Sequence, residues 1–383
     1  MKDILVSIER LWRTWFVYPL FRLILNNQRV ALPIDLSHIN SLLVLRYDKI
    51  GDMIVTLPIF RILKARNPNL HIGVLASESN VEIVRGERSV DDVFILYRNP
   101  IKLFFQLTRI RNRRYQIVLN FIFNRMTSGA VIANFFCRDA VSIGQGQEKY
   151  AFYFNALIAL PRGTNHMVEM LANYVEQVFG LIIGDEERVM HMPLASDNSD
   201  VVNRFLGQRQ LRRRTERSEN HSNYVVFNVS ARQDNKRISE RQALSILSFL
   251  GNHHVKTVVI SAPEDKALGR HIVSNAKNVN CFYYPDAGMA DLGEIAWLIE
   301  GATGVITPDT AIIHIASAVS TPVLGIFTPI QVNQEWLPYK VKYQLIKASE
   351  GQPVETISEE ALISGLKKFL EIIPIIASTK ETA

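Results

Sequence analysis

Short apolar runs alternate with amphipathic stretches from Ser41 almost to the end of the chain. The runs expected to form strands are 42–45, 71–75, 92–96, 116–121, 141–144, 224–229, 257–260, 278–284, 304–306, 323–327 and 343–346. Helical periodicity lies between many of them, for example over 101–114, 165–180, 291–298 and 358–373. Strands alternating with helices predict βαβ units and mainly parallel sheets.

The first of these units reads LLVLRYDKIGDMIVTLPIFRILKAR, from Leu42 to Arg66. A buried strand is followed by a charged loop, 46–51, and then by an apolar helical stripe. Asp52 therefore lies where a strand ends and a helix begins, which is where open α/β sheets bind ligands. An aspartate at this place also serves simply as a helix cap. From this stretch alone the two interpretations are about equal.

A second stretch, GVITPDTAIIHIASAVSTPVLGIF from Gly304 to Phe327, repeats the plan late in the chain. A short strand leads into the turn at Asp309, Thr310 starts a helix, and Thr321-Pro322 ends it before the next strand. A chain of 383 residues is also too long for one core and suits two domains. We therefore expect an α/β protein with two Rossmann-like domains whose carboxyl strand ends face a central cleft.

The first 35 residues differ from the rest. The run LWRTWFVYPLFRLIL, 11–25, is aromatic and interrupted by Arg13, Pro19 and Arg22. It is too short and too charged to span a bilayer, and no cleavage site follows it. It is compatible with a helix lying on a membrane surface. The alternative, a helix packed on the protein itself, is slightly favoured.

Charge and motif content narrow the chemistry. The net charge of +6 suits an anionic substrate, a nucleic acid or a bilayer surface, but the basic run in 197–223 lacks the aromatic residues that stack on bases. The two cysteines, Cys137 and Cys281, have no metal-type spacing and are expected to be reduced thiols. There is no P-loop, no H-E-x-x-H and no Asp-x-Asp pair. We expect neither a metal ion nor a cofactor.

The two signature stretches resemble the ADP-heptose:lipopolysaccharide heptosyltransferase family, inverting glycosyltransferases of family 9 with the GT-B fold. The resemblance covers most of residues 41–346. The matching residues are Arg46, Gly51-Asp52, Thr56, Pro58, Asp309-Thr310, His314, Ala316, Thr321-Pro322 and Thr328-Pro329.

The resemblance implies a donor site in the second half. Lys236 matches a lysine that contacts donor phosphate, although Arg237-Ile238 replaces the usual Trp-Pro. Glu264 stands at a strand end where family members place an acid near the donor nucleoside. The residues expected to bind the donor are Lys236, Glu264, Asp309, Thr310 and His314, with Arg232 as a second cation in the loop.

The acceptor side is expected around the first signature. A general base must take the proton of the acceptor hydroxyl, and Asp52 is the residue that we assign to this role. Arg46, Lys49, Gly51 and His166 are expected to contact the acceptor or line the cleft. A histidine at a helix start is more often a cap or packing residue, and that interpretation of His166 stays ahead.

Taken together, the expected function is metal-independent, inverting transfer of a heptose from ADP-heptose to a lipopolysaccharide core or related glycan. The expected partners are an ADP-sugar and an anionic glycolipid, with no nucleic acid. We expect the protein in the cytoplasm, with peripheral contact to the inner membrane as an option. The alternatives are a GT-B enzyme for another nucleotide sugar and a non-catalytic paralogue that binds nucleotide sugars.

The expected domain organisation follows the same resemblance. It comprises a basic amphipathic segment (1–40), an acceptor-side domain (41–196), a linker (197–223), a nucleotide-sugar domain (224–350), and a terminal helix that crosses back, with a tail (351–383).

Overall fold

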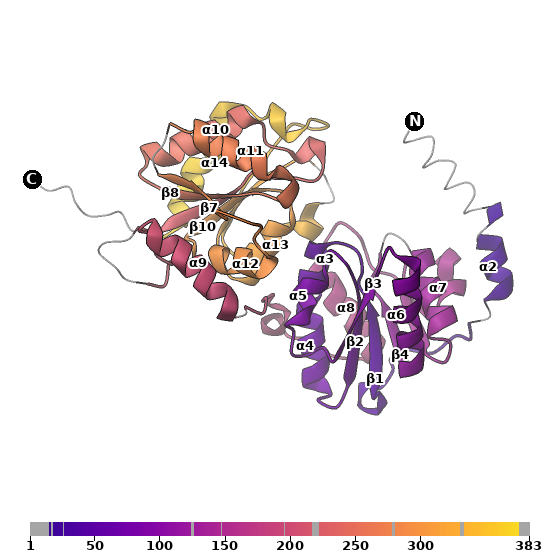
Figure 1. Cartoon of the computed structure of the whole chain (residues 1–383). Coiled ribbons are helices and arrows are strands. Elements are labelled where there is room, and N and C mark those ends of the chain that lie inside the picture. The colour runs from indigo at the N-terminus through magenta and orange to yellow at the C-terminus, as the bar shows by residue number, and fades with distance from the viewer. Residues whose placement is uncertain are drawn as a thin grey trace, which may run out of the picture. The chain divides into compact units, whose positions relative to one another are not determined.

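The computed structural model describes residues 15, 16, 18–25, 27–123, 126–146, 148–194, 196–216, 222–277, 280–329 and 333–374. The chain divides into two compact units (Figure 1). Unit 1 comprises Met1–Pro161 and Val168–Arg188, and unit 2 comprises Arg162–Met167 and Val189–Ala383.

Unit 1 is built on a six-stranded parallel sheet of order β3-β2-β1-β4-β5-β6. Its central strands β1 and β4 are buried except at Ser41, because helices cover the sheet, and their buried side chains are apolar apart from Asn120. The strands are β1 (Ser41–Leu45), β2 (His71–Ser77), β3 (Asp92–Leu96), β4 (Ile117–Asn120), β5 (Val141–Gln145) and β6 (Ala156–Ile158). The helices are α2 (Tyr18–Ile24), α3 (Ile50–Ile54), α4 (Leu57–Arg66), α5 (Val81–Arg85), α6 (Pro100–Arg113), α7 (Met126–Phe136) and α8 (Met167–Phe179).

Unit 2 repeats this topology, with strand order β12-β11-β10-β7-β8-β9 and parallel pairing throughout. Its strands are β7 (Tyr224–Asn228), β8 (Lys256–Ile260), β9 (Cys281–Tyr283), β10 (Gly304–Pro308), β11 (Val323–Phe327) and β12 (Tyr343–Lys347). Its helices are α9 (Ser196–Gln208), α10 (Glu240–Asn252), α11 (Lys266–Asn275), α12 (Leu292–Gly301), α13 (Ala311–Ala318) and α14 (Glu359–Ile372).

The predicted fold class, α/β with two Rossmann-like sheets, is confirmed. The strand order places the crossover between β1 and β4 in unit 1, and between β7 and β10 in unit 2. In open α/β sheets the carboxyl ends of strands at such a crossover form the ligand site. Both signature stretches begin at these strands, since they contain β1 and β10.

The range predicted as a linker, 197–223, contains most of α9. This helix packs on α12 of unit 2, and its Phe205 ring meets Tyr284 edge to face at 4.8 Å. Leu211 and Ser222 pair as a short parallel bridge. The terminal helix α14 packs on α10, β11 and β12 of the same unit.

The aromatic N-terminal run is described in part, since residues 1–14, 17 and 26 lie outside the described residues. Helix α2 packs one face on the 3-10 turn Glu148–Tyr153, where Tyr18 meets Tyr150 and Tyr153 edge to face. Its other face leaves Leu20 and Leu23 exposed. No helix among the described residues is long and apolar enough to cross a membrane.

Candidate active site

The turn after β1 places Asp52 in the first turn of α3. The N-cap residue of that helix is Lys49, and no side chain caps it. The interpretation of Asp52 as a simple helix cap is therefore wrong, because its carboxylate is used elsewhere. It lies 3.4 Å from the guanidinium of Arg46, and the Asp52 side chain is 14% exposed.

Arg46 is the centre of this turn and is almost fully buried. Its Nε donates to the main-chain oxygen of Asp52 at 2.8 Å, and its Nη1 donates to Asp48 at 3.1 Å and to the carbonyl of Phe121 at 2.5 Å. A buried guanidinium is tolerated only when carboxylates and carbonyls surround it in this way. The Arg46 side chain thus holds Asp52 at two points, the main-chain oxygen of Asp52 and the carboxylate of Asp52.

Asp48 is the residue of this turn that the sequence analysis missed. Burial raises the pKa of Asp48 to about 7, the Arg46 guanidinium lowers it, and the neighbouring Asp52 carboxylate raises it again. Arg46 thus carries one positive charge against two carboxylates. Burial and the Asp52 charge thus favour retention of a proton on Asp48, which is the behaviour expected of a carboxylate beside another carboxylate. The sequence signal was present, since Asp48 follows the same strand as Asp52.

A buried asparagine holds the loop from the neighbouring strand. The Asn80 amide donates to the main-chain oxygens of Arg46 at 3.0 Å and Lys49 at 3.3 Å. Thr56 donates its hydroxyl to the main-chain oxygen of Asp52 at 2.7 Å. Gly51 is buried within α3, and the Lys49 side chain is exposed. The predicted residues Arg46, Gly51 and Asp52 thus lie together, with the Lys49 ammonium facing solvent.

In unit 2, a polar network joins the carboxyl ends of β7 and β10. The Asn228 amide donates to the hydroxyls of Thr307 at 3.0 Å and Thr310 at 3.2 Å. Thr310 is the N-cap residue of α13, as predicted, and accepts from the N–H of Ile312. The start of α13 is therefore fixed against β7, and its first N–H groups carry the positive end of the helix dipole.

Lys236 and Asp309 form an ion pair beside this helix start. The Lys236 ammonium lies 2.5 Å from the Asp309 carboxylate, and the two side chains are 18% and 13% exposed. The structure thus brings together three residues predicted to bind the donor. The Arg237 that replaces the usual Trp pairs with Asp265 at 3.1 Å.

Glu264 lies in a 3-10 turn, Pro263–Asp265, after β8 and is exposed. The N–H of Ala262 donates to the Ser230 hydroxyl at 2.8 Å, which ties this turn to the loop after β7. Arg232 in that loop is exposed. Glu264 is therefore at the predicted strand end, with its carboxylate open to solvent.

His166 and His314 come together in unit 2, although they are far apart in sequence. The His166 ring stacks on Tyr339 at 4.4 Å, donates from its Nε2 to the carbonyl of Leu337 at 3.1 Å, and lies 6.3 Å from the His314 ring. Burial first, and the nearby His314 second, lower the pKa of His166 to about 3. His166 is therefore a packed, neutral residue near pH 7, consistent with the structural interpretation of this histidine.

A buried ion pair that the sequence analysis missed anchors the segment before His166. Arg162 binds the two carboxylate oxygens of Glu335 at 2.7 and 2.8 Å, and the N–H of Gly163 donates to the same carboxylate at 2.6 Å. Glu335 is completely buried. This bidentate pair explains why residues 162–167 belong to unit 2.

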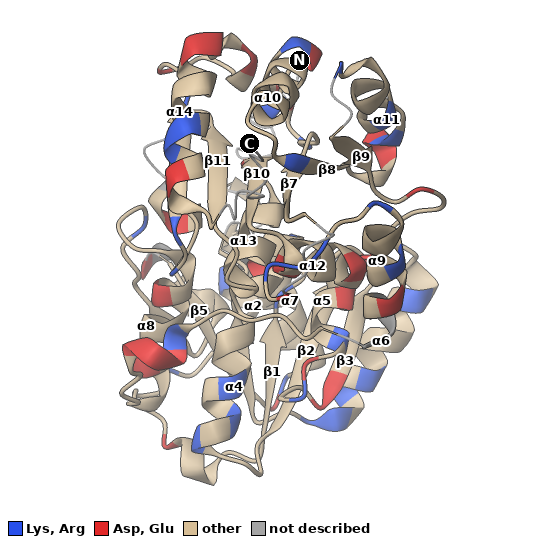
Figure 2. Cartoon of the chain, turned by 90° about the vertical axis from the view of Figure 1, so that its left-hand side faces the viewer, with Lys and Arg blue, Asp and Glu red and all other residues tan. Residues whose placement is uncertain are grey.

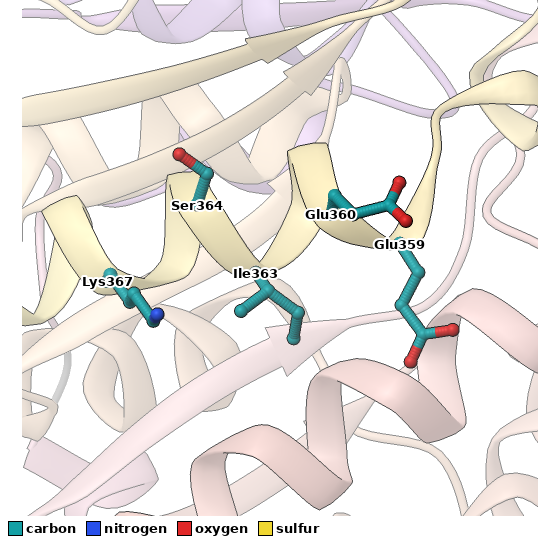
Figure 3. Close-up of a pocket in the computed structure, with 5 residues that line it drawn as sticks. All are labelled: Glu359, Glu360, Ile363, Ser364 and Lys367. Carbon is teal, nitrogen blue, oxygen red and sulfur yellow. The ribbon is translucent and has the colours of Figure 1, made fainter.

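Two other features carry no catalytic chemistry. A pocket of about 470 Å³ lies along α14 and is lined by Glu359, Glu360, Ile363, Ser364 and Lys367 (Figure 3). None of the predicted site residues lines it. Within the described part of the chain, His, Cys, Asp and Glu side chains form no group of three that could hold a metal ion.

Comparison with known proteins finds relatives that share this fold. Lipopolysaccharide heptosyltransferase 3 of Escherichia coli is 24% identical over 289 residues, which is 72% of this chain and 80% of that protein. The family 9 glycosyltransferase of Veillonella parvula DSM 2008 superposes with a TM-score of 0.72 at 17% identity, covering 88% of this chain and 99% of that one. The E. coli ADP-heptose lipopolysaccharide heptosyltransferase II gives 0.64 at 18% identity, covering 86% and 98%.

These superpositions show a GT-B-like fold. The family model described as glycosyltransferase family 9 (heptosyltransferase) matches residues 106–363, which include all six strands of unit 2. With a match of this extent, the chain belongs to glycosyltransferase family 9 and is a glycosyltransferase.

Proposed function

We propose that this glycosyltransferase moves a heptose from ADP-heptose to a lipopolysaccharide core or related glycan, with inversion at the anomeric carbon. The observation that carries the proposal is the pair of charged strand-to-helix turns, one in each unit. The turn of unit 1 holds a carboxylate with excess negative charge. The turn of unit 2 holds an ammonium beside a helix start. A base and an anion site are the two elements that such a transfer needs.

The base is Asp52. Its carboxylate accepts the proton of the acceptor hydroxyl while the hydroxyl oxygen forms a bond to the anomeric carbon. The bond from that carbon to the diphosphate oxygen breaks on the opposite face, and the electron pair leaves with ADP. Arg46 positions the carboxylate, and Asp48 shares the Arg46 guanidinium with Asp52. Asp48 acts through Asp52 and is a positioning residue.

The diphosphate site is Lys236 with the start of α13. Lys236 is already held by Asp309, so a diphosphate oxygen would compete with that carboxylate for the ammonium. The first N–H groups of α13 add partial positive charge at the same place. Asp309, once released, is free to accept hydrogen bonds from sugar hydroxyls. Negative charge that grows on the leaving phosphate is stabilised by these preorganised groups.

The donor class rests on the exposed Glu264 at the end of β8, which suits a ribose, and on the substrates after which the relatives are named. Heptosyltransferase II of E. coli is named for ADP-heptose and lipopolysaccharide. Calorimetric titration of ADP and UDP into the protein tests this assignment. We expect ADP to bind more tightly, and tighter binding of UDP would favour the alternative of a different nucleotide sugar.

Metal independence is a separate part of the proposal. It rests on the absence of an Asp-x-Asp pair in the sequence and on the cationic groups available for the diphosphate. Transfer measured by release of ADP should continue at a nearly unchanged rate in a strong chelator. Loss of activity that Mg²⁺ or Mn²⁺ restores would contradict the charge assignment above.

A further inference from the structure

Helix α6 of unit 1 is strongly basic. The range 98–116 around it contains six Lys or Arg residues and no Asp or Glu. The helix is well formed, since Asn99 caps it by accepting from the N–H groups of Ile101 and Lys102. Leu107 and Ile110 are buried and pack it against the core of unit 1.

The face of α6 opposite this core is apolar. Ile101 is 68% exposed, Phe104 63% and Phe105 62%. Their spacing of three and four residues places them next to one another on one side of the helix. Single exposed apolar residues are common on protein surfaces, whereas a contiguous apolar group marks a contact site.

Cations flank this apolar face. At 100° per residue, Lys102 and Arg109 lie along one side of it and Arg111 along the other. The Lys102 ammonium lies over the Tyr97 ring, and the Arg109 guanidinium lies over Phe94. Arg113 is paired with Asp92 at 2.9 Å and is therefore not counted among the cations that flank the apolar face. Figure 2 shows the blue segments that follow one another along α6.

We propose that α6 docks unit 1 onto an anionic phospholipid bilayer, with the helix lying along the membrane surface. An apolar stripe flanked by Lys and Arg is the pattern of helices that bury their apolar face at the boundary between headgroups and acyl chains. Aromatic side chains are favoured in that zone. The cations match the negative surface potential of such a bilayer. An acidic protein partner would match the charges but would leave the three apolar side chains without a counterpart.

The proposal is independent of the sugar transfer, because vesicles without any glycolipid acceptor test it. The full-length protein is sedimented with vesicles of phosphatidylcholine, with or without phosphatidylglycerol. We expect binding to the anionic vesicles that decreases with salt, and much weaker binding to the neutral ones. Equal binding to both would overturn the charge assignment.

Substitutions then locate the surface. Phe104→Ser with Phe105→Ser should lower vesicle affinity at least about 10-fold, given the apolar area that two phenylalanines withdraw from water. The matched control is Ile182→Ser, since Ile182 is an apolar residue of unit 1, 89% exposed and outside α6. It should leave binding unchanged. Equal thermal melting of all variants excludes misfolding as the cause.

Charge substitutions test the flanks. Arg109→Glu with Arg111→Glu should abolish the preference for anionic vesicles. Arg241→Glu with Lys368→Glu is the control with the same change of charge, since both residues are exposed and lie on helices of unit 2. Equal losses in both variants would mean that net charge alone attracts the protein, and would overturn the role of α6.

Two further outcomes would count against the proposal. If Trp15→Ser with Phe16→Ser removes vesicle binding and the α6 variants do not, the N-terminal segment is the membrane contact. If the wild type is dimeric by light scattering and the Phe104, Phe105 variant is monomeric, the face joins two copies of the chain.

Discussion

The turns after β1 and β10 follow the same plan of strand, acid and helix, yet their charges are arranged oppositely. In unit 1 a buried arginine is surrounded by two carboxylates and two carbonyls, so the cation is fixed and the carboxylates are in excess. In unit 2 one lysine meets one carboxylate at the start of a helix. A fixed cation suits the positioning of a base, whereas a lysine in a simple pair suits exchange with an anionic ligand. Two turns of similar topology therefore support different chemistry, because the cation of each turn has different partners.

The largest expected effect comes from removing the fixed cation. Arg46→Met leaves the partly buried Asp48 and Asp52 without their counter-ion, and should lower the free energy of unfolding by about 3–5 kcal/mol. Lys236→Met is the matched change in unit 2 and should lower it by less than about 2 kcal/mol. Urea denaturation followed by circular dichroism measures both. Equal losses would remove the distinction between the two turns.

The second prediction concerns turnover. Asp52→Asn keeps the size of the side chain but cannot accept the proton, so the rate of ADP release should fall about 100-fold or more. Its affinity for ADP should stay almost unchanged, because the nucleotide is assigned to unit 2. Near-normal transfer by this variant would rule out Asp52 as the base.

The third prediction concerns ADP affinity, which Asp52→Asn should leave almost unchanged. Lys236→Ala should weaken ADP binding roughly 10- to 150-fold, since a hydrogen bond to a charged group contributes about 1.5–3 kcal/mol. Turnover should fall as well, because the same phosphate gains charge in the transition state. Lys277→Ala, which removes an exposed lysine of the same unit, is the control for net charge. An unchanged dissociation constant for Lys236→Ala would count against the donor site.

The smallest effect is a dependence of stability on pH in the turn of unit 1. The pKa of Asp48 is raised from 3.8 to about 7, so the folded state retains a proton that the unfolded chain releases. The contribution of Asp48 to the free energy of unfolding is fully present below about pH 4 and is lost as the pH rises through about 7. Asp48→Asn should therefore raise the melting temperature at pH 8 by a few degrees and change it little at pH 4.

The corresponding change in unit 2 has the opposite sign. Asp309→Asn removes the partner of Lys236 and should lower the melting temperature at pH 8. Differential scanning calorimetry measures the melting temperatures of both variants. A lower melting temperature for Asp48→Asn at pH 8 would show that its carboxylate stabilises the turn after all.

Much of the architecture could be read from the sequence. The strands predicted over 92–96 and 323–327 coincide with β3 and β11, and the others agree to within a few residues, because buried parallel strands are nearly continuous apolar runs. The start of α13 at Thr310 was equally readable, since a threonine cap acts through its own neighbours in the chain. Local patterns are sufficient wherever the decisive interaction is local.

The partners of the charged residues were decided by the tertiary structure. Asp48 acquires its raised pKa from burial in the folded turn, and Lys236 meets Asp309 only because β7 and β10 are adjacent in the sheet. Glu335 binds Arg162 although the two residues are 173 positions apart in the chain, and no local pattern marks that pairing. The sequence by itself thus indicated the turns that carry charge and the strands of the two sheets except β6. Which charges meet there depends on desolvation and on contacts between distant segments, which exist only once the chain has folded.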